Sequence, residues 1–146
     1  MLCCATNHFT VQSMQIRIER RVDMYDEIFI TDMLFFGKHG VYQPEKDKGG
    51  RFSVDLHLFM DLTQAGRSDQ LTDTLDYEKL YRHVQQIMEG PSKNLLEALA
   101  DDIARSIFAL DARIMEMVVT VRKLDPPFPG AFGALGSTIR RLRSSM

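Results

Sequence analysis

The sequence predicts an α+β domain in which two helices cover one face of a four-stranded antiparallel sheet. Apolar segments with the alternation of strands lie on both sides of a central region. That central region contains two segments with the apolar spacing of helices, and glycine or proline marks several boundaries. The order strand, strand, helix, helix, strand, strand is typical of an antiparallel sheet with helices packed on one side.

The first two strands are expected in the N-terminal half of the domain. Residues 27–36, EIFITDMLFF, are apolar and aromatic with partial alternation, and they end at Gly37. The polar segment 39–50 contains glycine and proline and is expected to be a loop. Residues 51–62 alternate regularly, which indicates an antiparallel strand with one face in the core. That face is formed by Phe52, Val54, Leu56, Leu58 and Met60.

Two helices and two further strands complete the domain. The first helix is expected over Tyr77–Met88, because apolar residues recur at helical spacing before a Gly-Pro stop. The second is expected over Leu95–Leu110, where leucine, isoleucine and alanine form one apolar stripe. Strands are then expected over residues 114–123 and 135–142.

The composition excludes several classes of protein. The chain has 146 residues, of which 45% are hydrophobic and 26% charged, as expected for one globular domain. A net charge of -2 gives no electrostatic signal for nucleic acid, and no apolar run approaches the roughly 20 residues of a membrane-spanning helix. Cys3 and Cys4 are adjacent and cannot form a disulfide framework, so we expect a reducing, cytoplasmic location.

The N-terminal segment differs from the rest of the chain. It contains both cysteines and a charged stretch, but neither regular apolar periodicity nor the apolar region of a signal peptide. We therefore expect a domain over residues 26–146, and residues 1–25 to be a flexible extension or the product of a misplaced start.

Lys123 is the residue that the strand pattern itself singles out. It continues one alternating set in the third strand, so its side chain is expected on the core-facing side of the sheet. The rest of that set is Met115, Met117, Val119 and Val121. One interpretation is a strand-end lysine whose ammonium reaches water. The alternative is a partly desolvated amine beside a wall that the prolines of DPPFPG make stiff, which favours proton transfer.

Other candidate residues also have structural alternatives. Glu97 stands three residues after Asn94, which is the spacing of a capping box, but a carboxylate at a helix start can also bind paired N–H donors of a ligand. Glu45 is interpretable as a solvated acid, Tyr77 as a helix-start residue with a half-buried ring, and His39 as a turn residue. The spacing contains neither a metal-ligand cluster nor a phosphate-binding glycine pattern.

The motifs HGVYQPE, TLDY, NLLE and VRKLDPPFPG, in this order, closely resemble the dihydroneopterin aldolase family of folate biosynthesis. The resemblance covers about residues 26–141. It implies the tunnelling fold and a homo-oligomeric ring, a tetramer or octamer, with active sites between subunits. It also implies retro-aldol cleavage of dihydroneopterin to hydroxymethyl-dihydropterin and glycolaldehyde, with epimerisation to dihydromonapterin expected as well. The alternatives are a dihydroneopterin triphosphate epimerase, or a non-catalytic ring protein that binds pterin.

The resemblance also implies the roles of individual residues. Glu97 corresponds to the acid that anchors the pterin, with Leu96 beside it in the substrate site. Lys123 corresponds to the lysine that transfers protons, Glu45 to an acid near it, and Tyr77 to a tyrosine supplied by the adjacent subunit. No cofactor, metal or Schiff base is expected, because the imine of the substrate accepts the electrons that are released.

The sequence departs from the family pattern at one place near the expected site. The family usually has Gly-Gln after the loop, whereas this chain has Gly49-Gly50-Arg51. The missing amide is expected to affect the rate of the reaction rather than its type.

Overall fold

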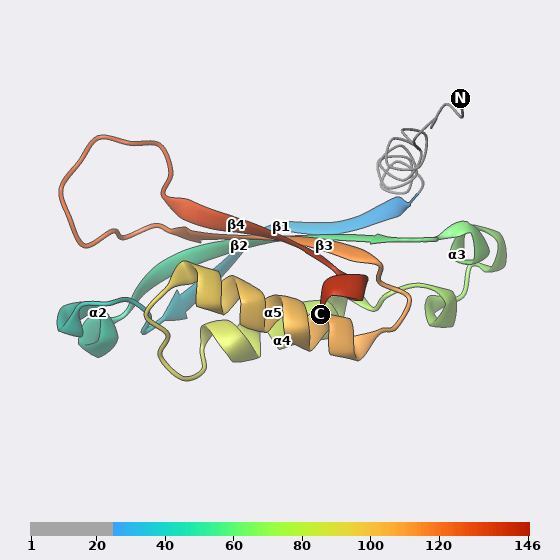
Figure 1. Cartoon of the computed structure of the whole chain (residues 1–146), viewed down its shortest axis with the longest axis horizontal. Coiled ribbons are helices and arrows are strands. Elements are labelled where there is room, and N and C mark those ends of the chain that lie inside the picture. The colour runs from blue at the N-terminus through green and yellow to red at the C-terminus, as the bar shows by residue number, and fades with distance from the viewer. Residues whose placement is uncertain (1–24) are drawn as a thin grey trace, which may run out of the picture.

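The structure is a computed structural model that describes residues 25–146. In these residues a single antiparallel sheet has the strand order β1-β2-β3-β4, and two helices lie together on one of its faces (Figure 1). The strands are β1 (Asp26–Gly37), β2 (Gly50–Met60), β3 (Glu116–Lys123) and β4 (Gly136–Leu142), and the helices are α4 (Tyr77–Met88) and α5 (Leu96–Leu110). The predicted architecture is confirmed. The prediction for the N-terminal segment lies outside the described residues, apart from Tyr25.

The core lies between the sheet and the two helices. The β2 residues predicted to face the core are all buried, and so are Met117, Val119 and Val121 of β3. The helices bury a matching set: Leu80, Val84 and Met88 from α4, and Leu99, Ala100, Ile103, Ala104, Ile107 and Phe108 from α5. Each fully buried aliphatic side chain of this size stabilises the fold by about 1.5–3 kcal/mol. This core fixes the ends of β2, β3 and α5, from which the candidate site is built.

A β-bulge explains why alternation in the first strand is incomplete. Two residues of β1, Thr31 and Asp32, lie opposite the single residue Asp55 of β2. Asp32 has a φ of 54°, and its N–H donates to the Asp55 carboxylate at 2.9 Å. The extra residue brings two apolar pairs, each with a different parity in the sequence, onto the core face of the sheet. These pairs are Ile28 with Ile30, and Met33 with Phe35.

Several local predictions were wrong. The segment 39–50 is not entirely a loop, because it contains the short helix α2 (Gln43–Lys48), which has Pro44 in its first turn, where a proline is compatible with a helix. The strand β3 begins at Glu116, so Met115 lies before it and is exposed. The sequence analysis also missed three short elements: α3 (Thr63–Ser68), η1 (Leu71–Asp73) and η2 (Arg143–Ser145).

Candidate active site

Lys123 and Glu45 form a largely buried ion pair at one end of the sheet. The lysine Nζ lies 2.5 Å from Glu45 Oε1, and the two side chains are 12% and 13% exposed. Lys123 is the last residue of β3 and pairs with Phe52 of β2, so the core-facing parity predicted for it is confirmed. The strand-end lysine therefore does not direct its ammonium into water, but holds it against a carboxylate in a poorly hydrated place.

The local fold around α2 prepares Glu45 for this contact. Glu45 Oε2 accepts the Tyr42 N–H at 3.2 Å, while Oε1 is left to the lysine. The chain can pass this close to the carboxylate because residue 40 is a glycine: its φ is +147°, and a Cβ there would come within 2.3 Å of Glu45 Oε2. Burial opposes ionisation of Glu45, but the hydrogen bonds from Lys123 and Tyr42 outweigh it and lower its pKa.

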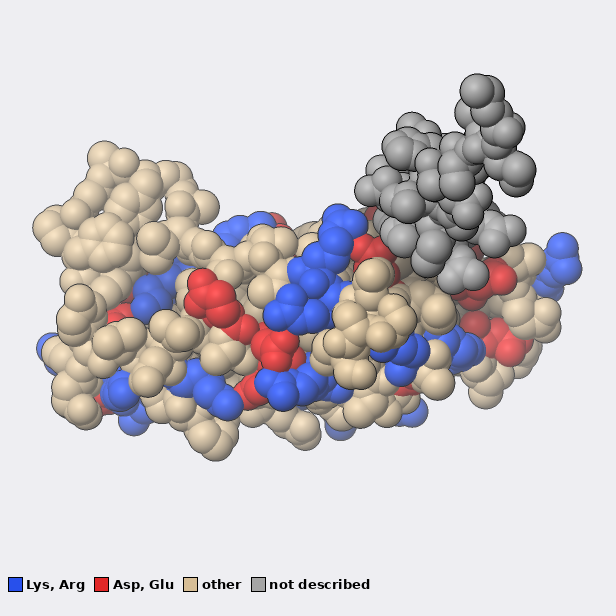
Figure 2. Space-filling view, in the orientation of Figure 1, with Lys and Arg blue, Asp and Glu red and all other residues tan. Residues whose placement is uncertain are grey.

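The segment after Lys123 forms an apolar wall beside the ion pair. A cavity of about 450 Å³ lies between α2 and this segment, and Glu45, Tyr42 and Phe128 are among its lining residues. The rings of Phe128 and Phe132 lie 5.6 Å apart. In Figure 2 the projecting part of the loop between β3 and β4 is a lobe that shows no acid or base, in contrast to the mixed acids and bases over the rest of the visible face.

A second ion pair attaches this wall to the start of β2. Asp125 accepts the Arg51 N–H at 2.9 Å and two hydrogen bonds from its guanidinium, and these lower the pKa of Asp125 to about 2. Gly50, the residue before Arg51, is the position at which the sequence departs from the glutamine expected by resemblance. A Cβ there would lie 3.7 Å from the Asp125 Cβ, which is ordinary contact. The beginning of the loop is thus held by Arg51 rather than by a side chain at position 50.

Glu97 does not act as the helix cap that its spacing indicated. The helix α5 begins at Leu96, so Leu95 takes the N-cap position and Asn94 makes no side-chain capping bond. Glu97 is exposed in the first turn and has no hydrogen-bond partner among the described residues. The predicted capping box is wrong, and the carboxylate is left available for a ligand. Leu96 is half-buried and packs against the core.

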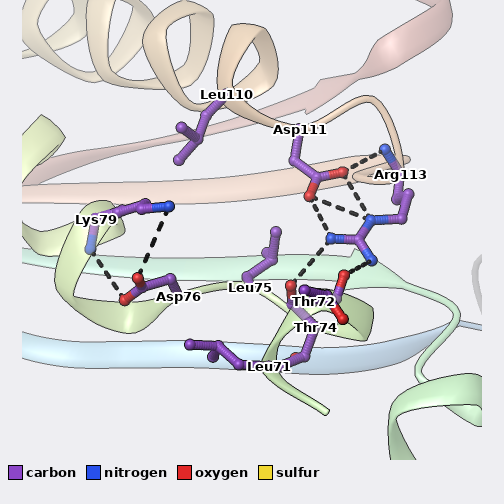
Figure 3. Close-up of a pocket in the computed structure, with 9 residues that line it drawn as sticks. All are labelled: Leu71, Thr72, Thr74, Leu75, Asp76, Lys79, Leu110, Asp111 and Arg113. Atoms are coloured by element: carbon purple, nitrogen blue, oxygen red, sulfur yellow. Dashed lines mark hydrogen bonds and ion pairs between the residues drawn. The ribbon is translucent and has the colours of Figure 1, made fainter.

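Tyr77 begins α4, as predicted, and the loop before it is held firmly. Asp76 accepts the N–H groups of Glu78 and Lys79 and so caps the helix. Figure 3 shows the Arg113 side chain directed at this loop. Its guanidinium donates to the carbonyls of Thr72 and Thr74 at 3.2 and 3.0 Å, and it pairs with Asp111. The sequence analysis missed Arg113, because nothing in the spacing pairs residues so distant in the chain.

Tyr77 lies far from Lys123 of the same chain. The carbonyl of Met88, at the far end of α4, accepts a hydrogen bond from His39, whose ring packs on Phe52, the β-sheet partner of Lys123. The helix rises roughly 16 Å between Tyr77 and Met88. Figure 1 shows α2 and the β3–β4 loop at one end of the sheet and α3 at the other. The ring of Tyr77 is exposed. Within one subunit, the structure therefore does not bring Tyr77 to the ion pair.

The part of the chain that the structure describes has neither a metal-binding cluster nor a membrane-spanning helix. Residues 25–146 contain no group of three or more histidine, cysteine, aspartate or glutamate side chains suited to holding a metal ion. No helix in this part of the chain is long and apolar enough to cross a membrane.

These features define a small α+β protein with an enzyme-like site: a largely buried lysine–glutamate pair beside an apolar wall, and an acid at a helix start that has no partner within residues 25–146. The family model described as dihydroneopterin aldolase matches residues 28–140. A dihydroneopterin aldolase from Staphylococcus epidermidis is 43% identical over 118 residues, which are 81% of this chain and 98% of that protein. Another from Bacillus subtilis is 37% identical over 82% of this chain and 99% of its own length.

Solved structures agree with these matches. A dihydroneopterin aldolase structure from Vibrio cholerae has a TM-score of 0.74 and 27% identity, covering 81% of this chain and 98% of that one. The Escherichia coli dihydroneopterin aldolase in complex with neopterin shares the fold, with a TM-score of 0.72 and 24% identity over 80% of this chain and 98% of that one. The chain belongs to the dihydroneopterin aldolase family. It is a lyase that breaks a carbon–carbon bond, and its architecture is the tunnelling fold.

Proposed function

We propose that this chain cleaves dihydroneopterin to hydroxymethyl-dihydropterin and glycolaldehyde. The observation that carries the proposal is the Lys123–Glu45 pair, which this chain, a member of the family, keeps largely away from water. A lysine amine held in one position at the edge of a cavity is a suitable proton carrier, because a group that transfers protons must be held within hydrogen-bond reach of the substrate. The pterin complexed by the Escherichia coli relative supports a pterin as the substrate.

The reaction requires three tasks of the protein. A side-chain hydroxyl of the substrate loses its proton, its electrons form the carbonyl of glycolaldehyde, and the carbon–carbon bond breaks. The ring imine of the dihydropterin accepts the released electrons, and the exocyclic carbon is then protonated. In this scheme Lys123 and Tyr77 carry the protons with water, and Glu45 orients the lysine. Glu97 anchors the pterin by accepting its paired N–H groups, with Leu96 beside the ring.

We also propose that Lys123 forms no Schiff base. Its Nζ is already bound by the Glu45 carboxylate at 2.5 Å. The substrate contains its own electron acceptor, so the proposed chemistry needs neither a covalent adduct nor a metal. Borohydride treatment during turnover should therefore trap no adduct on Lys123.

We further propose that the site is completed by a second copy of the chain. Tyr77 begins α4, and the other end of that helix lies near the strand partner of Lys123, so both residues can serve one substrate when Tyr77 comes from a neighbour. The edge strand β1 exposes Phe29, Leu34 and Phe36, and β4 forms the other edge of the sheet. Pairing of β1 with β4 of a neighbour would cover these edges and, when repeated, close a ring. The expected tetramer or octamer, like the cytoplasmic location, stays a prediction.

The test is incubation of the purified protein with dihydroneopterin, with glycolaldehyde, hydroxymethyl-dihydropterin and the epimer dihydromonapterin measured separately. We expect the first two in equal amounts, and the same rate in excess chelator. Epimer without glycolaldehyde would favour the epimerase alternative. Pterin binding with no product would favour the non-catalytic ring protein. Activity that is lost in chelator and restored by a divalent ion would refute the metal-free mechanism.

A further inference from the structure

His39 is a buried histidine that the proposed reaction does not use. Its side chain lies between the loop that leads into α2 and the connection between α4 and α5, and the residue is 2% exposed. The sequence analysis interpreted it as a turn residue. A turn residue at the surface makes few contacts, whereas this ring is enclosed and has a hydrogen bond at each nitrogen.

The two hydrogen bonds fix one form of the ring. Nε2 lies 2.7 Å from the Met88 carbonyl oxygen, which can only accept, so Nε2 carries the proton. Nδ1 accepts the Lys93 N–H at 3.1 Å, so it carries none. His39 is therefore the neutral Nε2–H tautomer. Burial lowers its pKa, the bond to Met88 opposes this, and the charges of Lys123 and Lys93 lower it further.

These bonds connect the two segments that carry the acids of the site. The Gly40 N–H donates to the Lys93 carbonyl at 2.9 Å, beside the histidine bond to the Lys93 N–H. The loop with His39 continues into α2 and Glu45, whereas Lys93 stands four residues before Glu97. The ring fits because residue 37 is a glycine: a Cβ at this position would lie 2.6 Å from the His39 ring.

We infer that His39 is a positioning residue for the active site: its neutral ring holds the loop of Glu45 in place against the helix start of Glu97. The inference rests on the proposed function of those two acids. It assigns no proton transfer to His39, whose two nitrogens are both occupied. Small displacements of catalytic groups can cost up to about 100-fold in rate, so a tie of this kind has a measurable effect.

The test compares three variants of the full-length protein. His39→Leu removes both hydrogen bonds, and His39→Gln supplies a donor and an acceptor at a similar separation. His83→Leu is the matched control, since His83 is a half-buried histidine that also joins two elements, through a 3.0 Å bond to Ser106, but has no hydrogen bond to either acid. Pterin affinity, kcat and hydrogen exchange of residues 89–95 are measured for each.

We expect His39→Leu to weaken pterin binding and to lower kcat, each by about tenfold or more, and to speed exchange in residues 89–95. His39→Gln should restore both within about threefold, and His83→Leu should change neither. Faster exchange in His39→Leu with unchanged affinity and kcat would overturn the inference, because the tie would then be structural. Equal loss in His39→Gln would also overturn it.

A pH comparison keeps the inference testable if His39→Leu does not fold. A protonated His39 cannot accept the Lys93 N–H. Below the ordinary histidine value of 6.5, the wild type should therefore lose pterin affinity before His39→Gln does. Identical pH profiles would overturn the inference. If the wild type binds pterin but does not cleave dihydroneopterin, the proposed function fails, while affinity and exchange still decide the role of His39.

Discussion

Mixing two inactive variants measures whether Tyr77 and Lys123 act across a subunit boundary. Tyr77→Phe subunits retain the lysine, and Lys123→Ala subunits retain the tyrosine. Tyr77 begins α4, which rises roughly 16 Å before it reaches Met88, and it is the Met88 end of the helix that lies near the strand partner of Lys123. We therefore expect that one subunit does not supply both residues to one site. In a mixed ring, a site is complete when its lysine comes from the first variant and its tyrosine from the second.

The expected recovery follows from random assembly. In an equal mixture each residue of a site is intact half of the time, so about one quarter of the sites are complete and about one quarter of wild-type activity should return. The variants are unfolded together, refolded and assayed for glycolaldehyde, with each variant refolded alone as the control. No recovery in rings shown to contain both variants would refute the shared site. A monomer with full activity in sedimentation would refute it as well.

Three further predictions concern single residues. Glu97→Ala should abolish tight pterin binding, since each charge-assisted hydrogen bond contributes about 1.5–3 kcal/mol. Lys123→Ala should bind pterin within about tenfold of wild type and turn over at least ~100-fold more slowly. Equal losses of pterin affinity in the two variants, measured by titration, would contradict this division of roles. Because the pKa of Glu45 is lowered from 4.5, its ion pair with Lys123 should stabilise the fold fully above pH 4.5 and less as the pH falls through the lowered pKa. The free energies of unfolding of wild type and Glu45→Gln, measured in urea, should therefore become equal in acid. Arg113→Lys keeps the charge but loses the planar guanidinium that contacts Thr72, Thr74 and Asp111 together, so kcat should fall about tenfold. An unchanged kcat would show that Arg113 does not act through the tyrosine.

The regular parts of the fold could be predicted from the sequence because an element that buries one face has apolar residues at a regular spacing. β2 buries one face along its whole length, and α4 has both a clear apolar stripe and a capping aspartate before it. The bulge in β1 could not be predicted in this way, since the apolar residues change from even to odd positions across it without any turn signal in the sequence. The short helix α2 was missed because six residues are too few to show a helical period or to be stable as an isolated helix, and its Glu45 makes a contact with distant Lys123 that spacing does not reveal.

The candidate site was predictable to the same extent. Strand parity placed Lys123 correctly, because it depends on counting alone. Local spacing misplaced Glu97 in a capping box, since a helix that begins one residue later breaks the geometry while the letters stay the same. The tie through His39 joins residues 54 positions apart and could not be read from spacing. Contacts of this range become visible when the fold brings the segments together.

The bulge in β1 has a consequence for how the strand tolerates changes in length. Loss of one residue at Thr31 or Asp32 would leave one residue opposite Asp55, so the ladder would become regular and both apolar pairs would still face the helices. Loss of one residue anywhere else in the strand would turn one half of it over. A single deletion at this point would therefore keep the core but remove the local bend and twist of the outer strand. Such a shortened chain would show separately what the curvature of that edge contributes to assembly.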